Sequence, residues 1–182
     1  ESEINYNQFL KSLKSLINLN LIVLKSFLNN KDLLDLHPLV KEFIRYKFPR
    51  SERSKFITLL EKHYDKFIFI LKPRLTENLP LSSYENWTHK IELEINKADF
   101  KTALVVLEEI DESIIKAGYA EEYIRVTKIL FNKIDWQLAV DEEYSYFLSQ
   151  LSNFVETLTH FGEKDYAESL LSKYAGCISG KG

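Results

Sequence analysis

The chain has 182 residues, 45% of them hydrophobic, which is enough for one sizeable core or two small modules. We find no apolar run near the roughly 18 residues that a transmembrane helix needs and no signal-peptide pattern after Glu1. The single cysteine, Cys177, excludes an internal disulfide and fits a reducing cytoplasm. We therefore expect a cytoplasmic protein that does not attach to a membrane.

The formal net charge of −3 conceals an asymmetry along the chain. Residues 1–74 carry 14 Lys and Arg against 8 Asp and Glu, whereas residues 75–182 carry 10 against 19. Such a split suggests two modules with different surroundings. The basic part is compatible with nucleic acid or a phosphate-bearing ligand, but also with charges spread over solvated helix faces. The sequence contains no Met, and we expect it to be a piece of a longer protein.

With only 5 Gly and 4 Pro, the composition favours a mainly α protein. Apolar residues at three- and four-residue spacing predict a first helix from Ile4 to Asn18. Two short apolar runs then follow, Leu19 to Leu28 and Leu33 to His37, separated by the turn residues Asn29 to Asp32. They predict one β-hairpin, the only sheet we expect.

At Pro38 the period becomes helical again, since proline suits the first position of a helix. A further helix is expected from a cap at Ser51 to about Lys72, where Pro73 ends it. Its predicted buried line is Phe56, Leu60, Tyr64, Phe67 and Leu71.

The segment Leu75 to Pro80 is the best candidate for a linker, because the sign of the charge changes there. Ser82 and Glu85 form a capping box that predicts the start of a helix. Paired helices follow, with a turn near Ala98 and breaks at Gly118 and Gly162, and Asp141 is expected to cap a long helix. The predicted buried stripes are Trp87, Ile91, Ile95; Phe100, Ala103, Leu104, Leu107, Ile110, Ile114; Tyr119, Tyr123, Val126, Leu130, Ile134; Tyr144, Phe147, Leu148, Leu151, Phe154, Val155, Leu158, Phe161; and Ala167, Leu170, Leu171, Tyr174.

Two of the turns resemble each other, in ADFKTALVVL from Ala98 and GEKDYAESLL from Gly162. Each has a small residue at the turn and an alanine five residues on, which lets antiparallel helices approach closely. This pattern is typical of stacked helix pairs, although the spacing of the two alanines makes any repeat irregular.

A helix, a hairpin, LHPLVKEF from Leu36 and then helical repeats together resemble the middle of a STAND-class signalling ATPase. The resemblance implies a partial winged helix at 1–48, a linking helix and linker at 49–80, and tetratricopeptide-like repeats at 81–182. It implies no cofactor in this region, but ADP or ATP in the complete protein.

Leu36-His37-Pro38 matches the place where the related NB-ARC proteins carry Met-His-Asp, although Leu36 and Pro38 depart from that pattern. The resemblance implies that His37 contacts the β-phosphate of ADP in the complete protein. A helix N-terminus does stabilise an anion. The alternative is a histidine that only caps the helix at Pro38 or packs beside the hairpin.

No catalytic chemistry is apparent in the sequence, and we expect this region not to be an enzyme. The tail GCISGKG from Gly176 lacks the spacing and the Ser or Thr of a P-loop. His63, His89 and His160 lie on separate predicted helices, so we expect no metal site.

Three functions remain open at this point. The first is a sensor that binds a protein or small effector on its repeats and relays this binding, through the winged helix, to its own nucleotide-binding domain. Such a protein would form homo-oligomers on activation. The second is a plain interaction scaffold. The third and least favoured is a DNA-binding regulator, because the helix Ile4 to Asn18 offers only Lys11 and Lys14 as cations. No partner-binding residue can be assigned, although tyrosines are common interface anchors and equally common between packed helices. The tyrosines singled out are Tyr84, Tyr119, Tyr123, Tyr144 and Tyr146.

Overall fold

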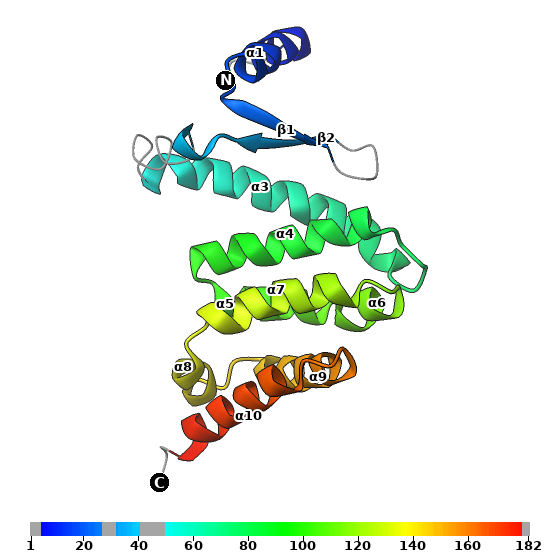
Figure 1. The fold of residues 1–182 in the computed structure, drawn as a ribbon, viewed down its shortest axis with the longest axis vertical. Helices are drawn as coiled ribbons and strands as arrows, with labels where there is room; N and C mark the ends of the chain where they lie inside the picture. Colours follow the sequence, from blue (N-terminus) through cyan, green and yellow to red (C-terminus); the bar gives the residue numbers. More distant parts are fainter. Residues whose placement is uncertain (1–4, 27–31, 41–49, 180–182) are drawn as a thin grey trace. The chain divides into compact units, whose positions relative to one another are not determined.

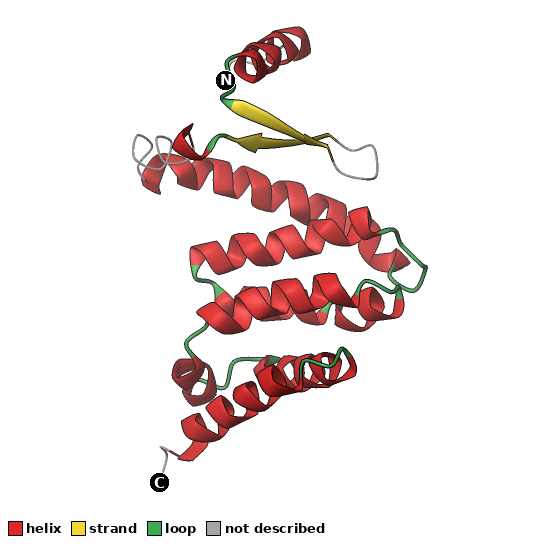
Figure 2. Cartoon of the chain, viewed as in Figure 1, coloured by secondary structure: helices red, strands yellow, loops and turns green. Residues whose placement is uncertain are grey.

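The computed structural model describes residues 5–26, 32–40 and 50–179 (Figure 1). These residues are mainly helical (Figure 2). The chain divides into two compact units, Glu1–Phe56 and Ile57–Gly182, and the boundary falls inside helix α3, Arg50–Leu71. None of the helices described here combines the length and the apolar character needed to cross a membrane.

The first unit contains helix α1, Tyr6–Asn18, followed by strands β1, Ile22–Ser26, and β2, Asp32–Leu36. The side chain of Asn5 caps α1 by accepting a hydrogen bond from the Asn7 N–H at 3.0 Å. The two strands pair antiparallel, with Ile22 opposite Leu36. The N–H of His37 donates to the carbonyl of Leu21 at 3.1 Å, so the pairing continues to the residue where the next helix begins.

Residues 38–40 are helical, as expected after Pro38. The rest of that predicted helix, with Phe43 and Ile44, lies outside the described residues, as does the turn from Asn29 to Lys31. Ser51 is the second residue of α3, so it is not the cap that the sequence suggested.

The predicted buried line of α3 is confirmed at Tyr64 and Leu71, which pack against the core, and is wrong at its other three residues. Ile68 is buried, and Ile57, Tyr64 and Leu71 are half-buried on the same side. Phe56 and Phe67, which were expected inside, are exposed; Phe56 keeps 65% of its surface. Leu60 is exposed as well. The helix carries two apolar lines that share Tyr64 and Leu71 and differ at adjacent residues such as Phe67 and Ile68, and spacing alone does not show which one packs.

Helix α4, Leu81–Lys97, begins one residue before Ser82, so the predicted capping box is wrong. The extended backbone of Pro80 takes the cap position instead, without a side-chain hydrogen bond. The predicted stripe of α4 is confirmed, because Trp87, Ile91 and Ile95 are all buried. A short turn of 3-10 helix, η1, Lys72–Arg74, precedes this helix and contains Pro73.

The predicted helix between Phe100 and Gly118 is in fact two helices, α5, Phe100–Glu108, and α6, Asp111–Lys116. Asp99 caps α5 by accepting from the Thr102 N–H at 3.1 Å. Leu107, Ile110 and Ile114 stay buried across the break, so the apolar spacing gave no sign of it. Gly118, with a φ of +87°, then turns the chain into α7, Ala120–Lys133.

Three more helices complete the second unit: α8, Trp136–Asp141, α9, Phe147–His160, and α10, Lys164–Ser179. Asp141 ends α8, so it does not cap α9 as expected. Gly162, with a φ of +81°, makes the turn between α9 and α10. The predicted residues that prove buried in α9 and α10 are Phe147, Leu151, Phe154, Leu158, Ala167 and Leu170, whereas Leu148, Phe161 and Leu171 are exposed.

A cluster of aromatic rings fills the core where α7, α8 and α9 meet. The ring of Phe131 stacks on that of Phe154, with centroids 5.7 Å apart, and it also contacts Trp136 at 5.4 Å and Phe147 at 5.6 Å. Helices α4, α7 and α9 follow one another as layers of this unit (Figure 1).

Replacing Phe131 by Ala is expected to lower the free energy of unfolding by about 3–5 kcal/mol, because the substitution leaves a cavity among rings that have no room to close it. Urea denaturation followed by circular dichroism measures the loss. The matched control is Phe69→Ala, since Phe69 keeps 81% of its surface exposed and should change stability by less than about 0.5 kcal/mol. Equal losses for the two variants would contradict the assignment of the core.

Candidate functional site

His37 lies between β2 and the helical residues that follow it, and it is half-buried. Its Nδ1 accepts a hydrogen bond from the N–H of Leu39 at 3.3 Å, and its carbonyl accepts from the N–H of Val40 at 2.8 Å. His37 therefore acts as a local cap. With Nδ1 as the acceptor, a neutral imidazole carries its proton on Nε2 and can donate it to another group.

In the second unit, a hollow of about 470 Å³ opens at the turn between α8 and α9. We call it the aromatic hollow, and its lining includes Tyr144, Tyr146, Phe147, Leu148 and Tyr174. Its volume falls within the range of roughly 300–1,000 Å³ that is common for ligand pockets. The rings of Phe147 and Tyr174 lie 6.5 Å apart and join α9 to α10 at its base.

The turn that forms the rim of this hollow has a strained backbone. Glu143 and Tyr146 have φ values of +49° and +64°, and they are two of the four non-glycine residues with positive φ in the described part of the chain. A left-handed conformation costs a residue with a side chain about 1–2 kcal/mol. Hydrogen bonds from the N–H of Tyr144 to Ala139 and from the N–H of Phe147 to Tyr144 hold the turn in place.

Lys101, from α5, makes two contacts with the same turn. Its Nζ lies 4.6 Å from the centroid of the Tyr144 ring and 2.8 Å from Oε2 of Glu142. A lysine over an aromatic face is attracted by the electrons of the ring. These two contacts fix how Tyr144 faces the hollow.

A second hollow, of about 600 Å³, lies between the loop after η1, the break between α5 and α6, and α9. We call it the acidic hollow, because its lining includes Glu77, Glu108, Glu109, Asp111 and Glu112 with Lys116 as its lysine. Each of these carboxylates has a hydrogen-bonding partner. They differ in whether that partner carries a positive charge.

Asp111 and Glu108 are held by neutral donors. Asp111 keeps only 6% of its surface, and its Oδ2 accepts from the side-chain amides of Gln150 at 2.7 Å and Asn153 at 2.8 Å. The amide of Gln150 also donates to Oε2 of Glu108 at 2.6 Å. Neither carboxylate forms an ion pair with a lysine or arginine in residues 5–26, 32–40 and 50–179. The positive charge of Lys116 acts on Asp111 without forming an ion pair with it.

Tyr123 completes this network from α7, because its hydroxyl donates to Oε1 of Gln150 at 3.2 Å. Burial, reinforced by the negative charge of Asp111, raises the pKa of Tyr123 above its ordinary value. The phenol consequently stays protonated and remains a donor. The network ties α6, α7 and α9 together behind the acidic hollow.

The two hollows adjoin along α9. Ser149 lines the aromatic hollow, and its hydroxyl hydrogen-bonds to the acidic hollow's Glu108 at 3.3 Å. The aromatic hollow is lined by α8, the turn before α9, α9 and α10, and the acidic hollow by the loop after η1, the α5–α6 break and α9. We call these two neighbouring hollows together the α5–α9 groove. It is aromatic at one end and acidic at the other.

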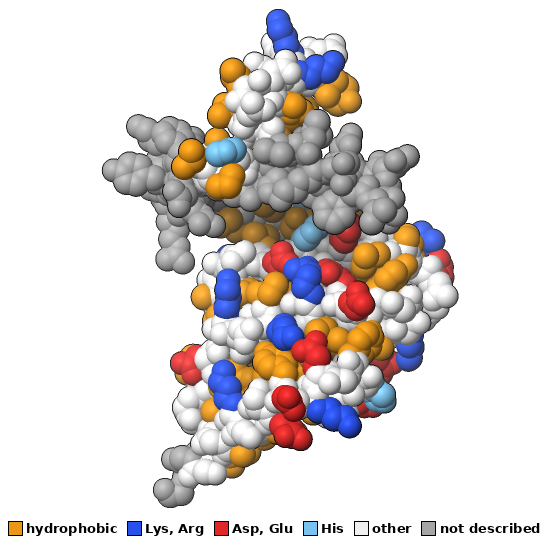
Figure 3. Space-filling model, in the orientation of Figure 1, with side chains coloured by type: hydrophobic (Ala, Val, Ile, Leu, Met, Phe, Trp, Pro, Cys, Tyr) orange, Lys and Arg blue, Asp and Glu red, His pale blue; other side chains and the backbone are white. Residues whose placement is uncertain are grey.

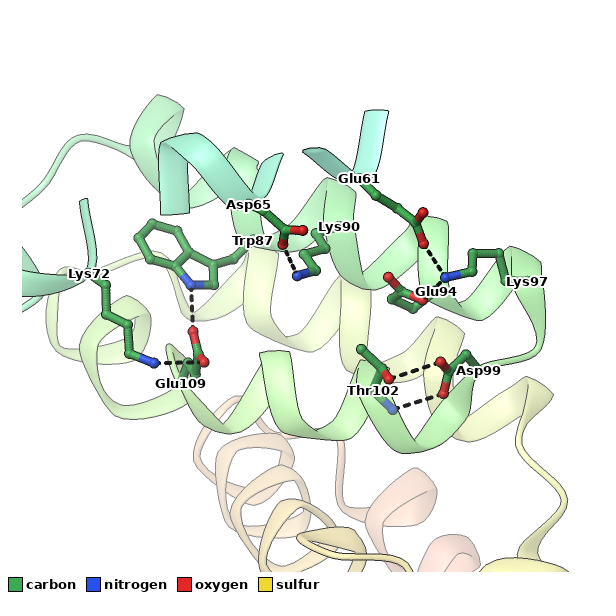
Figure 4. Close-up of polar contacts among 10 residues, drawn as sticks. All are labelled: Glu61, Asp65, Lys72, Trp87, Lys90, Glu94, Lys97, Asp99, Thr102 and Glu109. Carbon is green, nitrogen blue, oxygen red and sulfur yellow. Dashed lines mark hydrogen bonds and ion pairs between the residues drawn. The ribbon is translucent and has the colours of Figure 1, made fainter. Parts of the chain in front are cut away.

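Several other carboxylates of the second unit, including Glu109 of the acidic hollow, are paired with cations (Figure 4). Glu109 accepts from Lys72 at 2.8 Å and from the indole of Trp87 at 3.3 Å. Asp65 pairs with Lys90, while Lys97 bridges Glu61 and Glu94. Basic and acidic side chains are likewise interspersed on the face drawn in Figure 3.

At Glu122 of α7, burial opposes the charged form. The hydrogen bond and positive charge of Arg125 outweigh that burial and hold the pKa of this carboxyl below its usual range. Glu122 is therefore compensated by a cation that hydrogen-bonds to it, in contrast to Glu108 and Asp111.

The structure separates the tyrosines that the sequence could not sort. Tyr84 and Tyr123 are buried between helices, and Tyr119 is half-buried. Only Tyr144 and Tyr146 line the groove, where they meet Tyr174. The network around Asp111 and Gln150 gave no signal in the sequence, because its members are about 40 residues apart along the chain. In the described parts of the chain, no group of three or more His, Cys, Asp and Glu is placed to hold a metal.

No protein family matches the chain, and neither a curated protein sequence nor a solved structure shows significant similarity to it. The resemblance to STAND-class ATPases therefore depends on the LHPLVKEF motif and the order of elements, and the functional argument on the geometry above.

Replacing Asp111 by Ala is expected to lower the free energy of unfolding by about 1–3 kcal/mol, because the buried amide of Gln150 and the half-buried amide of Asn153 lose this acceptor. The neighbouring substitution Glu112→Ala, at a side chain that keeps 77% of its surface, should cost less than about 0.5 kcal/mol. Urea denaturation compares the two. If Asp111→Ala proved as mild as its neighbour, the buried network would not contribute to stability.

Proposed function

We propose that the chain is a non-catalytic regulatory region that binds a partner protein through the α5–α9 groove, within a STAND-type signalling ATPase. The α5–α9 groove is the observation that carries the binding role. It presents three tyrosines around a hollow of ligand-binding size, and tyrosine is enriched at protein interfaces.

The packing of the second unit supports this role. Short turns connect successive helices, and the aromatic cluster around Phe131 gives them a rigid core. A rigid scaffold that exposes aromatic side chains loses little conformational entropy on binding. In the proposal, this unit corresponds to the tetratricopeptide-like sensor expected at 81–182.

The first unit would correspond to the partial winged helix expected at 1–48, and His37 would contact the β-phosphate of ADP in the complete protein. Two features favour the contact: His37 precedes a helix N-terminus, and its Nε2 is the nitrogen left to donate. Binding at the groove would release this contact and permit nucleotide exchange and oligomerisation. Such a switch requires the partner to prefer the open state, because equal affinity for both states shifts nothing.

Replacing His37 by Ala in the complete protein is expected to speed ADP release about tenfold or more, because a hydrogen bond to a charged phosphate contributes about 1.5–3 kcal/mol. Stopped-flow displacement of a fluorescent ADP analogue measures the rate. The control is His89→Ala, at an exposed histidine of α4.

An unchanged rate for His37→Ala would remove the nucleotide-sensing role and leave His37 as the cap that the structure shows. A complete protein that binds no nucleotide at all would instead leave the chain as an interaction scaffold.

A further inference from the structure

We infer that the α5–α9 groove takes a basic amphipathic peptide segment of the partner, which places an aromatic or branched aliphatic side chain in the aromatic hollow and a Lys or Arg at the acidic hollow. This inference rests on the proposed function and adds the chemistry of the segment that is bound. It follows from the difference between the two ends of the groove.

The aromatic hollow favours an apolar side chain. Tyr146 and Leu148 keep 45% and 55% of their surfaces exposed on either side of the buried ring of Phe147. An apolar group seated between them would remove these surfaces from water, which is the main source of affinity at interface anchors. Tyr146 is held in this position at the expense of a left-handed backbone.

The acidic hollow favours a cation. Glu108 and Asp111 accept hydrogen bonds from neutral side-chain donors and form no ion pair among the described residues. The exposed carboxylates of Glu77 and Glu112 pair with single cations on their own segments, Arg74 and Lys116. A Lys or Arg from outside therefore meets a surplus of negative charge, whereas an anionic partner such as nucleic acid would be repelled.

The geometry of α9 sets the spacing in the partner. Ser149 at the aromatic hollow and Asn153 at the acidic hollow are four residues apart on the same face of α9, which corresponds to about 6 Å along the helix. An extended peptide covers this distance in about two residues, and a helical one in about four. We therefore expect the apolar anchor and the basic residue to lie two to four positions apart.

The experiment selects partners without assuming their identity. A phage library that displays random 12-residue peptides is panned against the chain, and the selected peptides are synthesised with a fluorescein label. Their dissociation constants are measured by fluorescence anisotropy at 50 mM and 300 mM NaCl. The expected winners carry an aromatic or branched aliphatic residue with Lys or Arg two to four positions away, and they bind more weakly at the higher salt concentration.

Two groove variants and one control separate the contribution of the aromatic hollow to binding from that of the acidic hollow. Tyr146→Gly removes the ring at a position whose backbone suits glycine, and it should weaken binding at least tenfold. Glu77→Gln combined with Glu112→Gln should weaken binding at least fivefold and flatten the salt dependence. Asp165→Asn combined with Glu168→Gln removes the same charge from exposed positions of α10 outside the groove and should leave binding unchanged. Circular dichroism confirms that each variant is folded.

The outcomes separate this inference from the proposed function. Suppose that the selected peptides lack basic residues, bind the Glu77 and Glu112 variant unchanged, and bind the Tyr146→Gly variant more weakly. This result would overturn the inference of a basic segment but would leave the proposal that a partner binds at the groove. Selected peptides whose affinity is the same for both groove variants and the unchanged chain, or a library that yields no binder, would overturn the inference and the proposed function together.

Discussion

The packing of Phe131 against the rings of α8 and α9 is the contact on which the second unit depends. Its ring lies within 6 Å of those of Trp136, Phe147 and Phe154, so one side chain of α7 fixes two later helices. Phe147 belongs to this cluster and also forms the base of the aromatic hollow. The shape of the proposed binding surface is therefore set by the core, and it is not left to a flexible loop.

The other end of the groove depends on hydrogen bonds instead of apolar packing. Gln150 is fully buried, yet both ends of its amide are occupied: the oxygen accepts from Tyr123, and the nitrogen donates to Asp111 and Glu108. A buried amide without such partners would cost about 1–3 kcal/mol. The same bonds hold two carboxylates that form no ion pair among the described residues, so the arrangement that fixes α6 against α9 also contributes to the surplus negative charge of the acidic hollow.

Much of the helical content could be predicted from the sequence, because apolar residues at three- and four-residue spacing directly report a helix with one buried face. The stripe through Trp87, Ile91 and Ile95 is an example, as are the turns at Gly118 and Gly162. The spacing of apolar residues failed to predict the structure where two arrangements of helices share the same spacing.

Three failures show the limits of that signal. Helix α3 offers two apolar stripes, and the choice between them depends on contacts made by other helices. The break at Ile110 leaves the buried spacing intact, and α8 is too short for a stripe to stand out. The groove itself was beyond prediction, because it is assembled from residues on α5, α8, α9 and α10.

The strained turn before α9 is the feature of the groove that bears most directly on a binding role. Glu143 and Tyr146 would avoid the left-handed region if stability alone determined their conformation, because a glycine at either position would remove the strain. The hydrogen bonds of Tyr144 and Phe147 and the cation of Lys101 hold the turn against this cost. A residue that its surroundings hold in the left-handed region, at the rim of an aromatic hollow, supports a functional hypothesis for this turn. It is consistent with a turn whose purpose is to present Tyr146 and Leu148 to a partner.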